Sequence, residues 1–495
     1  MKRVTWVQPE DLLRHELLQS TQEGKDVAAV RQTWSTAGYS VDPPVGGVSP
    51  EPAGPAERAL AGRLLDELAR LPDSTALDEP SDWPGILATM PPLGRDNRAT
   101  PRSPGTAKRG HEGGDEGVPF VAAVERGRPN QTIQPDRIKG AWLGRAVGCV
   151  LGKPVEKVPR AGIEEILRST GRWPLRRYFT AVGLDPLVAQ RWPWNRASRP
   201  TSLEENIDGT PEDDDINYTL MALRTLEHHG ADFDAGDVAT GWLLDLPAGR
   251  AFTAERIAYR NLLSGIEPPR TATVGNPFRE WIGAQIRTDL YGWVNPGNPL
   301  RAAEWAWRDA SVSHTRNGLY GAMFVGAMAA AAVAVDGSDA AAVERVLDVG
   351  ASVVPPASRM AAAIALGRRL GAAGIPPAEA YAALEAEFAG LHWVHALNNS
   401  ALVAYALTAG RGSFDQAICL TVTGGWDTDS NGATVGAVMG AVTGAAGIHP
   451  YWTDPLRGRV SSSIPGCDGA TFSELTARTL AVAERVSSSP VVTVR

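Results

Sequence analysis

Cysteine is scarce in this sequence, with 3 residues among 495. Cys149, Cys419 and Cys467 lie too far apart for the ligand spacings of a zinc site, and an odd, scattered set provides no disulfide framework. The first residues also lack the apolar core of a signal peptide, because Glu10 and Asp11 follow almost at once. Both absences favour a reducing compartment, and we expect a cytoplasmic protein.

An excess of positive charge is missing as well. The formal net charge is -8 and no face rich in lysine and arginine is visible, which argues against a nucleic-acid partner. The longest apolar run, near Leu319–Val335, ends at Asp336 and is short for a bilayer span. We interpret it as a buried helix and expect no membrane partner.

Alternating apolar and polar residues bounded by turn signals are also missing, so the sequence predicts no series of strands. Apolar residues recur instead at helical spacing. We therefore predict an all-α fold, with a compact multi-helix domain in the larger part of the chain. The expected helices include Ala56–Leu71, Ile216–His228, Leu319–Val335, Ala340–Val349, Ser358–Leu370, Pro377–Phe388, an uncharged segment Ala433–Ile448 and Ser473–Val486.

Composition divides the chain into three regions. Residues 1–91 predict a small helical N-terminal unit that contains a linker rich in proline and glycine. Residues 92–118 carry proline, glycine and mixed charge without apolar periodicity, so we expect a disordered linker there. Residues 119–488 form the predicted main domain, and no motif in residues 1–118 indicates a role for them.

Polar groups gather in residues 424–432, which read GGWDTDSNG. The glycines, Gly425 among them, let the backbone turn and approach a ligand closely, and the uncharged helix follows. Asp427 and Asp429 mimic the start of an EF-hand loop, but the twelfth position is Val438, where that loop needs glutamate. Two interpretations stay open: a site for a hard divalent cation, or a helix cap made by the aspartates.

Another acidic cluster comes earlier in the chain and precedes the predicted helix Ile216–His228; we call it the first acidic cluster, and the one around Asp427 and Asp429 the second. Pro211 is followed by Glu212, Asp213, Asp214 and Asp215. Acids at a helix N-terminus complement its dipole and cap free N–H groups, which is the structural interpretation. One cap needs only one acid, however, and neighbouring carboxylates repel each other. The two acidic clusters together therefore indicate a two-metal site.

Three motifs, in this order, resemble those of the ADP-ribosylglycohydrolases, the family of dinitrogenase-reductase-activating glycohydrolase and the ADP-ribosylarginine hydrolases. Residues 137–156 are similar to the family's opening helix and loop. Residues 213–215 are similar to its Thr-Asp-Asp metal motif, and residues 424–440 to its Gly-Gly-Asp-Thr-Asp-Thr segment with the trailing helix. The resemblance spans about residues 135–480.

The resemblance implies an all-helical hydrolase that uses two Mg²⁺ or Mn²⁺ ions to cleave the bond between ADP-ribose and a protein side chain or small molecule. It implies catalytic roles for Glu156, Asp214 and Asp427, and metal ligation by Asp213, Asp214, Asp215, Asp427, Asp429 and Ser430. An ADP-ribosylated protein or small molecule would be the partner. The chain departs from the family at Cys149, where many members have aspartate, at Asp213, where the family has threonine, and at Trp426, an insertion.

Other polar residues are candidates for substrate binding. His314, Asn317 and Gly318 begin the long apolar helix and are similar to a Thr-His segment of the family. His395 and Asn398 lie on one face of a predicted helix and within reach of a ribose or phosphate. For all of these, satisfying local backbone groups is the competing interpretation. Trp393 offers a surface for stacking a base, although a tryptophan among apolar residues is commonly core.

Two other classes of function compete with the hydrolase. A non-catalytic ADP-ribose-binding or structural protein would keep the same scaffold, but it has no need of both acidic clusters. A metal phosphatase would need an apolar strand running into Asp427, and the preceding Gly-Gly-Trp is unsuitable for that. The sequence leaves the modified group, and the choice between Mg²⁺ and Mn²⁺, open.

Overall fold

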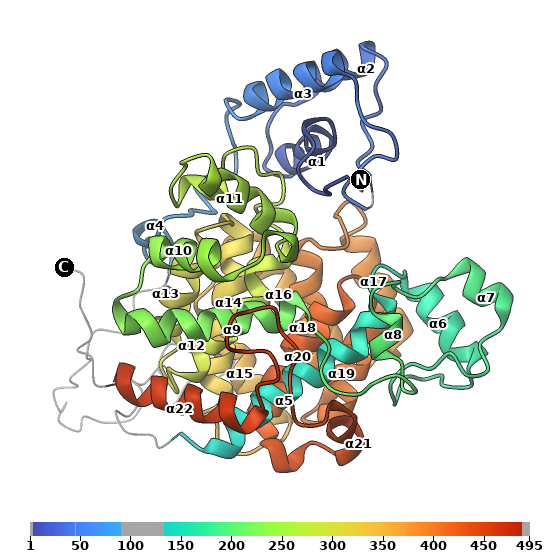
Figure 1. Cartoon of the computed structure of the whole chain (residues 1–495), viewed down its shortest axis with the longest axis vertical. Coiled ribbons are helices and arrows are strands. Elements are labelled where there is room, and N and C mark those ends of the chain that lie inside the picture. The colour runs from blue at the N-terminus through green and yellow to red at the C-terminus, as the bar shows by residue number, and fades with distance from the viewer. Residues whose placement is uncertain (1–2, 45, 91–132, 488–495) are drawn as a thin grey trace, which may run out of the picture.

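The computed structural model describes residues 3–44, 46–90 and 133–487. These residues form helices joined by turns and loops, with three isolated β-bridges and no sheet among them, which confirms the all-α prediction (Figure 1). None of the helices in these ranges combines the length and hydropathy needed to cross a membrane.

The N-terminal residues form four helices: α1 (Pro9–Gln22), α2 (Ala28–Thr36), α3 (Pro55–Leu68) and α4 (Trp83–Thr89). The longer helices of the main domain are α5 (Pro135–Gly152), α6 (Arg160–Ser169), α9 (Asp214–His229), α10 (Ala235–Asp245), α11 (Thr253–Leu263), α13 (Pro299–Ala310), α14 (Arg316–Ala332), α15 (Ala340–Ser352), α16 (Arg359–Ala372), α17 (Pro377–Glu387), α18 (Ala396–Gly410), α19 (Phe414–Thr423), α20 (Thr428–Thr443) and α22 (Phe472–Ser487). Shorter helices are α7 (Pro186–Arg191), α8 (Arg199–Ser202), α12 (Asp289–Trp293) and α21 (Pro450–Thr453), and the 3-10 turns η2 (Lys153–Val155) and η6 (Ile282–Arg287) lie beside the site.

The helices predicted from periodicity are present, most with ends within three residues of the expected positions. The exception is α20, which we expected over Ala433–Ile448. It begins at Thr428, directly after the turn at Gly425 and Trp426, so the polar residues form its first turn. It ends at Thr443 because Gly444 adopts a φ of 74°, a conformation that stops a helix.

Helices α5 and α20 form the centre of the main domain and pack antiparallel along a stripe of glycines. We call the contact between Gly140, Gly144, Gly148 and Gly152 of α5 and Gly440, Gly436, Gly432 and Thr428 of α20 the glycine seam. A Cβ atom on Gly144 would lie 2.0 Å from the carbonyl oxygen of Gly436, and one on Gly436 would lie 2.0 Å from that of Gly144. The two backbones therefore touch directly, as only glycine allows.

The glycine seam brings the carboxyl end of α5 beside the amino end of α20. There the Thr428 hydroxyl donates to the Gly152 carbonyl at 2.8 Å. Helix α9 packs against both helices, and its first turn lies near the same end of the seam (Figure 1). Three segments distant in sequence thus converge at one point, and each of them begins or ends there with polar residues.

The N-terminal helices pack on the edge of the main domain, where Figure 1 shows them in blue. They have a small apolar core of their own, built around Leu13, Leu17 and Trp34. Trp6, Leu12 and Ile86 join the main apolar core. The rest of the contact with the main domain includes buried charged groups, which we call the N-terminal interface. Arg279 donates to Glu16 at 2.8 Å and to Glu23 at 2.7 Å.

A second arginine adds to the N-terminal interface. Arg359 donates to Glu79 at 2.7 Å and to Glu280 at 2.9 Å, and Gln19 of α1 also donates to Glu280 at 2.7 Å. The predicted linker at 92–118 lies outside the described residues. The division of the chain into an N-terminal region and a main domain stays a prediction.

Candidate active site

A cavity of about 320 Å³ opens at the end of the glycine seam. Carboxylates and a hydroxyl line one part of it: Glu156, Glu212, Asp213, Asp214, Glu255, Asp427, Asp429 and Ser430. Basic side chains Lys153, Lys157 and Arg250 stand among them, and apolar side chains including Trp6, Phe252, Ile282, Trp393 and Val394 line the rest. Six of the predicted metal or catalytic residues therefore share one cavity.

The turn before α20 aims the second acidic cluster into this cavity. Gly425 has a φ of 85° and Trp426 a φ of 60°, so the chain reverses sharply just before the helix. Asp427 stands at the N-cap position, yet its side chain makes no capping hydrogen bond. Its own N–H is held instead by the Asn399 side-chain oxygen at 3.3 Å. The capping interpretation thus fails for Asp427, and its carboxylate is left for another partner.

The first acidic cluster begins α9, and here capping does account for one member. Asp213 accepts a hydrogen bond from the N–H of Asp215 at 3.0 Å, which is an N-cap contact. Its other oxygen pairs with the buried ammonium of Lys153. Asp215 lies behind the cavity wall and pairs with Arg145 at 3.4 Å. Asp214 has neither a capping bond nor an ion pair among the described contacts, and it lines the cavity.

One contact joins the two clusters directly. The hydroxyl of Ser430, in the first turn of α20, donates to a carboxylate oxygen of Asp215 at 3.4 Å. Arg145 also donates to Asp289 at 2.8 Å, so the charge of this arginine is shared between two carboxylates. The clusters therefore form one continuous acidic surface with fewer cations than carboxylates.

Burial and mutual repulsion raise the affinity of these carboxylates for protons. Burial raises the pKa of Asp427 well above its usual range, and Asp429 and Glu156 add to the shift. Burial does the same to the pKa of Asp214, with Asp213 and Asp429 adding to it. The pKa of Asp429 rises to about 7 through burial, Glu156 and Asp213. The nearby Lys153 and Lys157 offset only part of this effect, so a bound cation would stabilise the charged carboxylates further.

Asp213 is the exception. Burial acts to raise its pKa, but the neighbouring Lys153 ammonium outweighs burial, and the pKa of Asp213 lies below its usual range. The same contact, opposed by burial, raises the pKa of Lys153. Lys153 is therefore charged, and it neutralises one member of the first cluster.

Two groups of side chains have the geometry to hold a metal ion. Ligand atoms of Glu156, Asp427 and Asp429 lie within 4.8 Å of one another, as do those of Cys149, Asp213 and Asp215. The first group offers only carboxylate oxygens, the donors that Mg²⁺ and Mn²⁺ prefer. A hard divalent cation therefore fits the first group, which lines the cavity.

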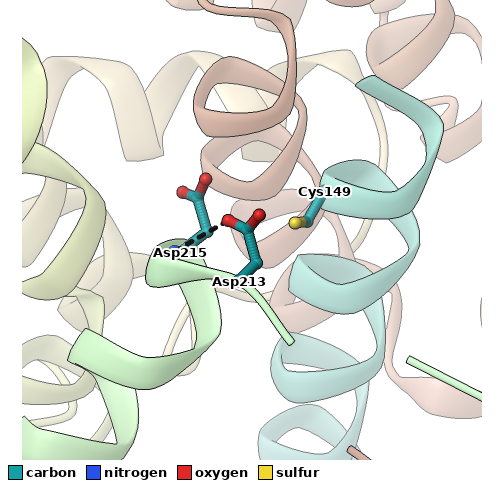
Figure 2. A group of neighbouring side chains, drawn as sticks. All are labelled: Cys149, Asp213 and Asp215. Atoms are coloured by element: carbon teal, nitrogen blue, oxygen red, sulfur yellow. Dashed lines mark hydrogen bonds between the residues drawn. The ribbon is translucent and has the colours of Figure 1, made fainter. Parts of the chain in front are cut away.

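The group around Cys149 is less suited to such an ion. In Figure 2 the thiol of Cys149 projects from α5 toward Asp213 and Asp215 at the start of α9. Burial raises the pKa of this thiol well above its usual value, and the nearby Asp213 and Asp215 add to the shift. A protonated thiol is a poor ligand for Mg²⁺. The aspartates of this group remain suitable ligands, while Cys149 acts as a small buried side chain.

Glu156 stands at the rim, where the chain leaves η2. It accepts a hydrogen bond from the side-chain amide of Asn195 and pairs with Lys157 at 3.1 Å. These contacts hold the carboxylate at the cavity, within the ligand group that it forms with Asp427 and Asp429. The geometry permits either metal ligation or proton transfer by Glu156.

The residues predicted to bind substrate lie elsewhere. His314, Asn317, Gly318, His395, Asn398 and Gly425 do not line the cavity. Asn317 donates to Glu79 at 2.9 Å and to Glu280 at 2.7 Å, so it belongs to the N-terminal interface. His395 caps α18 by accepting from the N–H of Leu397 at 3.2 Å. Substrate contact by these six residues stays a prediction. His395 bonds local backbone, as the competing interpretation expects, whereas Asn317 bonds side chains distant in sequence.

Several cavity residues were not predicted from the sequence. Lys153 lies four residues after Cys149, and this spacing placed it on the same helical face as a motif residue. The sequence gives no such spacing for Asn195 or Trp6. Asn195 reaches the cavity from the loop between α7 and α8, and Trp6 reaches it from the N-terminal region. Trp393, which we weighed as a stacking surface or as core, lines the cavity with part of its side chain exposed.

Comparison with known proteins agrees with the resemblance. A family model described as ADP-ribosylglycohydrolase matches residues 129–488. A solved structure described as an ADP-ribosylglycohydrolase-related protein complex is 22% identical, with 71% of this chain and 98% of that chain covered and a TM-score of 0.42. None of the curated proteins matches the chain. The family match confirms the resemblance drawn from the three motifs.

Proposed function

This chain belongs to the ADP-ribosylglycohydrolase family, and from that membership we propose that it is a metal-dependent hydrolase. It cleaves the N- or O-glycosidic bond between ADP-ribose and a modified side chain or small molecule. The observation that carries the proposal is the meeting of Asp214, Asp427 and Asp429 at one cavity, with no lysine or arginine paired to any of the three among the described ion pairs.

Metal binding is the simplest way to stabilise these carboxylates. Asp427, Asp429 and Glu156 are the proposed ligands on one side, and Asp214, with Asp213, Asp215 and Ser430, on the other. The ligand atoms of Glu156, Asp427 and Asp429 lie close enough to hold one Mg²⁺ or Mn²⁺ ion, and a second ion, as the family resemblance implies, would draw on Asp214 and its neighbours. A bound divalent cation would supply Lewis acidity toward ribose and water oxygens.

The protein's own groups would perform the remaining tasks. Glu156, oriented by Asn195, is placed to take a proton from an attacking water. The cavity is lined by apolar as well as acidic side chains, so it holds the ribose end of the substrate away from bulk water. The acidic surface faces the bond to be broken, where positive charge develops on the sugar as the leaving group departs.

A second function is favoured by one observation. Lys153 pairs with Asp213 inside the first cluster, and a resident cation weakens the need for a bound metal. A non-catalytic protein that binds ADP-ribose would tolerate this arrangement. Retention of Glu156, Asp427 and Asp429 as a separate ligand group favours the hydrolase.

ADP-ribose release from a panel of ADP-ribosylated arginine, serine and nucleobase substrates tests the proposal. Wild type is compared with Asp214→Asn and Asp427→Asn, in Mg²⁺, in Mn²⁺ and in EDTA. Asp348→Asn is the matched control, because Asp348 pairs with Arg368 away from the cavity. We expect turnover that needs a divalent cation and falls more than about 100-fold in both site variants. Metal-dependent binding of ADP-ribose without turnover of any substrate would favour the binding protein.

A further inference from the structure

Residues outside the family match contribute to the cavity. The family model begins at residue 129, yet Trp6 lines the same cavity as the carboxylates. Only 7% of Trp6 is exposed, and it lies on the part of the wall that also contains Ile282 and Trp393. The family resemblance therefore carries no information about Trp6.

Trp6 is held in place from two sides. Its backbone N–H donates to the carbonyl of Gly47 at 2.7 Å, and a Cβ atom on Gly47 would lie 2.2 Å from the indole ring. The preceding residue, Thr5, accepts from Arg256 of α11 through its carbonyl at 3.0 Å and its hydroxyl at 2.7 Å. Trp6 itself adopts a φ of 63°, which non-glycine residues rarely do. A strained residue held by this many contacts indicates that the indole is needed where it is.

Aromatic rings fix the orientation of the indole. Trp6 meets Phe278 edge to face with ring centroids 5.4 Å apart, and Trp281 likewise at 5.7 Å. Trp281 in turn stacks on His392 at 4.2 Å. The segments that carry these rings continue directly into Ile282 and Trp393, which line the cavity. Trp6 is thus part of an aromatic cluster that lines the same cavity as the carboxylates.

We propose that Trp6 is a specificity-determining residue, which forms the apolar end of the cavity and packs against a planar group of the substrate. The inference rests on the proposed hydrolase function. Two sources of a planar group exist in an ADP-ribosylated substrate: the adenine base, and the group attached to the ribose, such as a guanidinium. Both pack favourably on an indole, the first by stacking and the second by a cation–π contact.

Binding measurements separate these sources. Isothermal titration with ADP-ribose and with ribose 5-phosphate, in Mn²⁺, is run on the full chain as wild type, Trp6→Ala, Trp6→Phe and Trp83→Ala. Trp83 is the matched control, because it lies in the same N-terminal region and packs on Trp307 away from the cavity. Circular dichroism and thermal denaturation verify that each variant is folded.

If Trp6 packs on adenine, Trp6→Ala weakens ADP-ribose binding about tenfold while ribose 5-phosphate binding is unchanged. If it packs on the departing group, ADP-ribose binding is unchanged, and KM for the substrate that turns over best rises about tenfold with little change in kcat. In either case Trp6→Phe keeps affinity and KM close to the wild-type values, and Trp83→Ala behaves as wild type.

The inference is overturned if Trp6→Ala matches Trp83→Ala in both affinity and KM. It is also overturned if Trp6→Phe is as impaired as Trp6→Ala, because a structural role in the wall would then account for the loss. Failure of wild type to bind ADP-ribose at all would instead remove the proposed function, and this inference with it. Normal wild-type binding with an unaffected Trp6 variant leaves the proposed function standing.

Discussion

The glycine seam and the N-terminal interface are built on opposite physical principles. The glycine seam joins α5 and α20 backbone to backbone, with no charged side chain between the paired glycines. The N-terminal interface joins α1 to the main domain through buried arginines and glutamates, such as Arg279 with Glu16 and Glu23. The glycine seam depends on shape, whereas the N-terminal interface depends on charge.

The two regions also contribute different parts of the cavity. Asp427, Asp429 and Glu156 stand at the end of the glycine seam, and Trp6 stands at the N-terminal interface. The carboxylates are thus fixed by contacts that tolerate almost no substitution. Trp6 is held instead by the carbonyl of Gly47 and by the rings of Phe278 and Trp281, next to the buried ion pairs of the N-terminal interface. Reaction chemistry and substrate choice are therefore supported separately.

The largest effect is expected from Gly436→Ala in the glycine seam. Its new methyl group would lie 2.0 Å from the carbonyl of Gly144, so the two central helices would have to separate. We expect loss of most of the folded protein, measured by circular dichroism and thermal denaturation. Gly62→Ala is the control, because Gly62 lies within α3 with no atom in the way, and it gains up to about 1 kcal/mol. Normal stability of Gly436→Ala would show that the seam is not closely packed.

The next largest effect is expected from Arg279→Met in the N-terminal interface. This change leaves Glu16 buried without its cation and Glu23 with only Lys25, which costs about 3–5 kcal/mol. We expect the loss to be confined to the N-terminal helices, with early proteolytic cleavage there and a main-domain transition that is preserved. Arg168→Met, which breaks an exposed pair with Glu164, is the control and costs less than about 1 kcal/mol. A single cooperative loss of the whole fold would show that the two regions are not independent.

Acid is expected to weaken the N-terminal interface before the glycine seam. Burial, with Arg14, lowers the pKa of His15 from 6.5 to about 3, and burial also lowers that of His392, whose ring is 5.8 Å away. A lowered pKa in the folded state stabilises the fold above pH 6.5, and this contribution is lost as the pH falls from 6.5 toward 3. At pH 5 the loss is about 2 kcal/mol for His15.

Detachment of the N-terminal helices, which we call their release, is measured by tryptophan fluorescence and limited proteolysis between pH 8 and pH 4. His15→Phe should shift the release to lower pH, whereas His228→Gln, at an exposed position, should leave it in place. An unchanged midpoint in His15→Phe would exclude His15 as the acid-sensitive group.

The smallest effect is expected from Lys153→Met, at the point where the glycine seam ends and charges begin. Removing the ammonium paired with Asp213 leaves a carboxylate free for a divalent cation. We expect Mn²⁺ affinity to rise about tenfold, or about 1.4 kcal/mol, by isothermal titration. Lys25→Met removes a lysine paired with Glu23 in the N-terminal interface and should leave Mn²⁺ affinity unchanged. Weaker Mn²⁺ binding in Lys153→Met would mean that Lys153 supports the metal site instead of competing with it.

Local patterns predicted the glycine seam's helices well. The uncharged segment after Asp429 predicted a packed helix, and α20 is one, although it begins five residues earlier, directly after the turn at Gly425 and Trp426. The pairing of the acidic clusters predicted a shared site, and the structure places Asp214 and Asp427 at one cavity. The helices depend on residues close in sequence, whose periodicity is visible, whereas the shared site was inferred from two separate acidic motifs.

The N-terminal interface was not predictable in the same way. Its ion pair between Glu16 and Arg279 joins residues 263 positions apart. The local sequence around either residue does not indicate its partner. We expected residues 1–91 to be a separate unit without a readable role. The place of Trp6 at the cavity follows from Gly47, Arg256 and the surrounding rings together, a set that only the folded chain assembles.

The four-residue spacing of the seam glycines has a consequence for how α5 and α20 can move. The pairs 140–440, 144–436, 148–432 and 152–428 step along both helices together. Sliding one helix by a single residue would bring side chains against backbone, and the glycines would face each other again only after a shift of about 6 Å. The glycine seam therefore allows one axial register of the two helices. The two helices cannot slide past each other by a fraction of this shift, so the axial separation of Glu156 and Asp427 stays fixed as long as α5 and α20 remain packed.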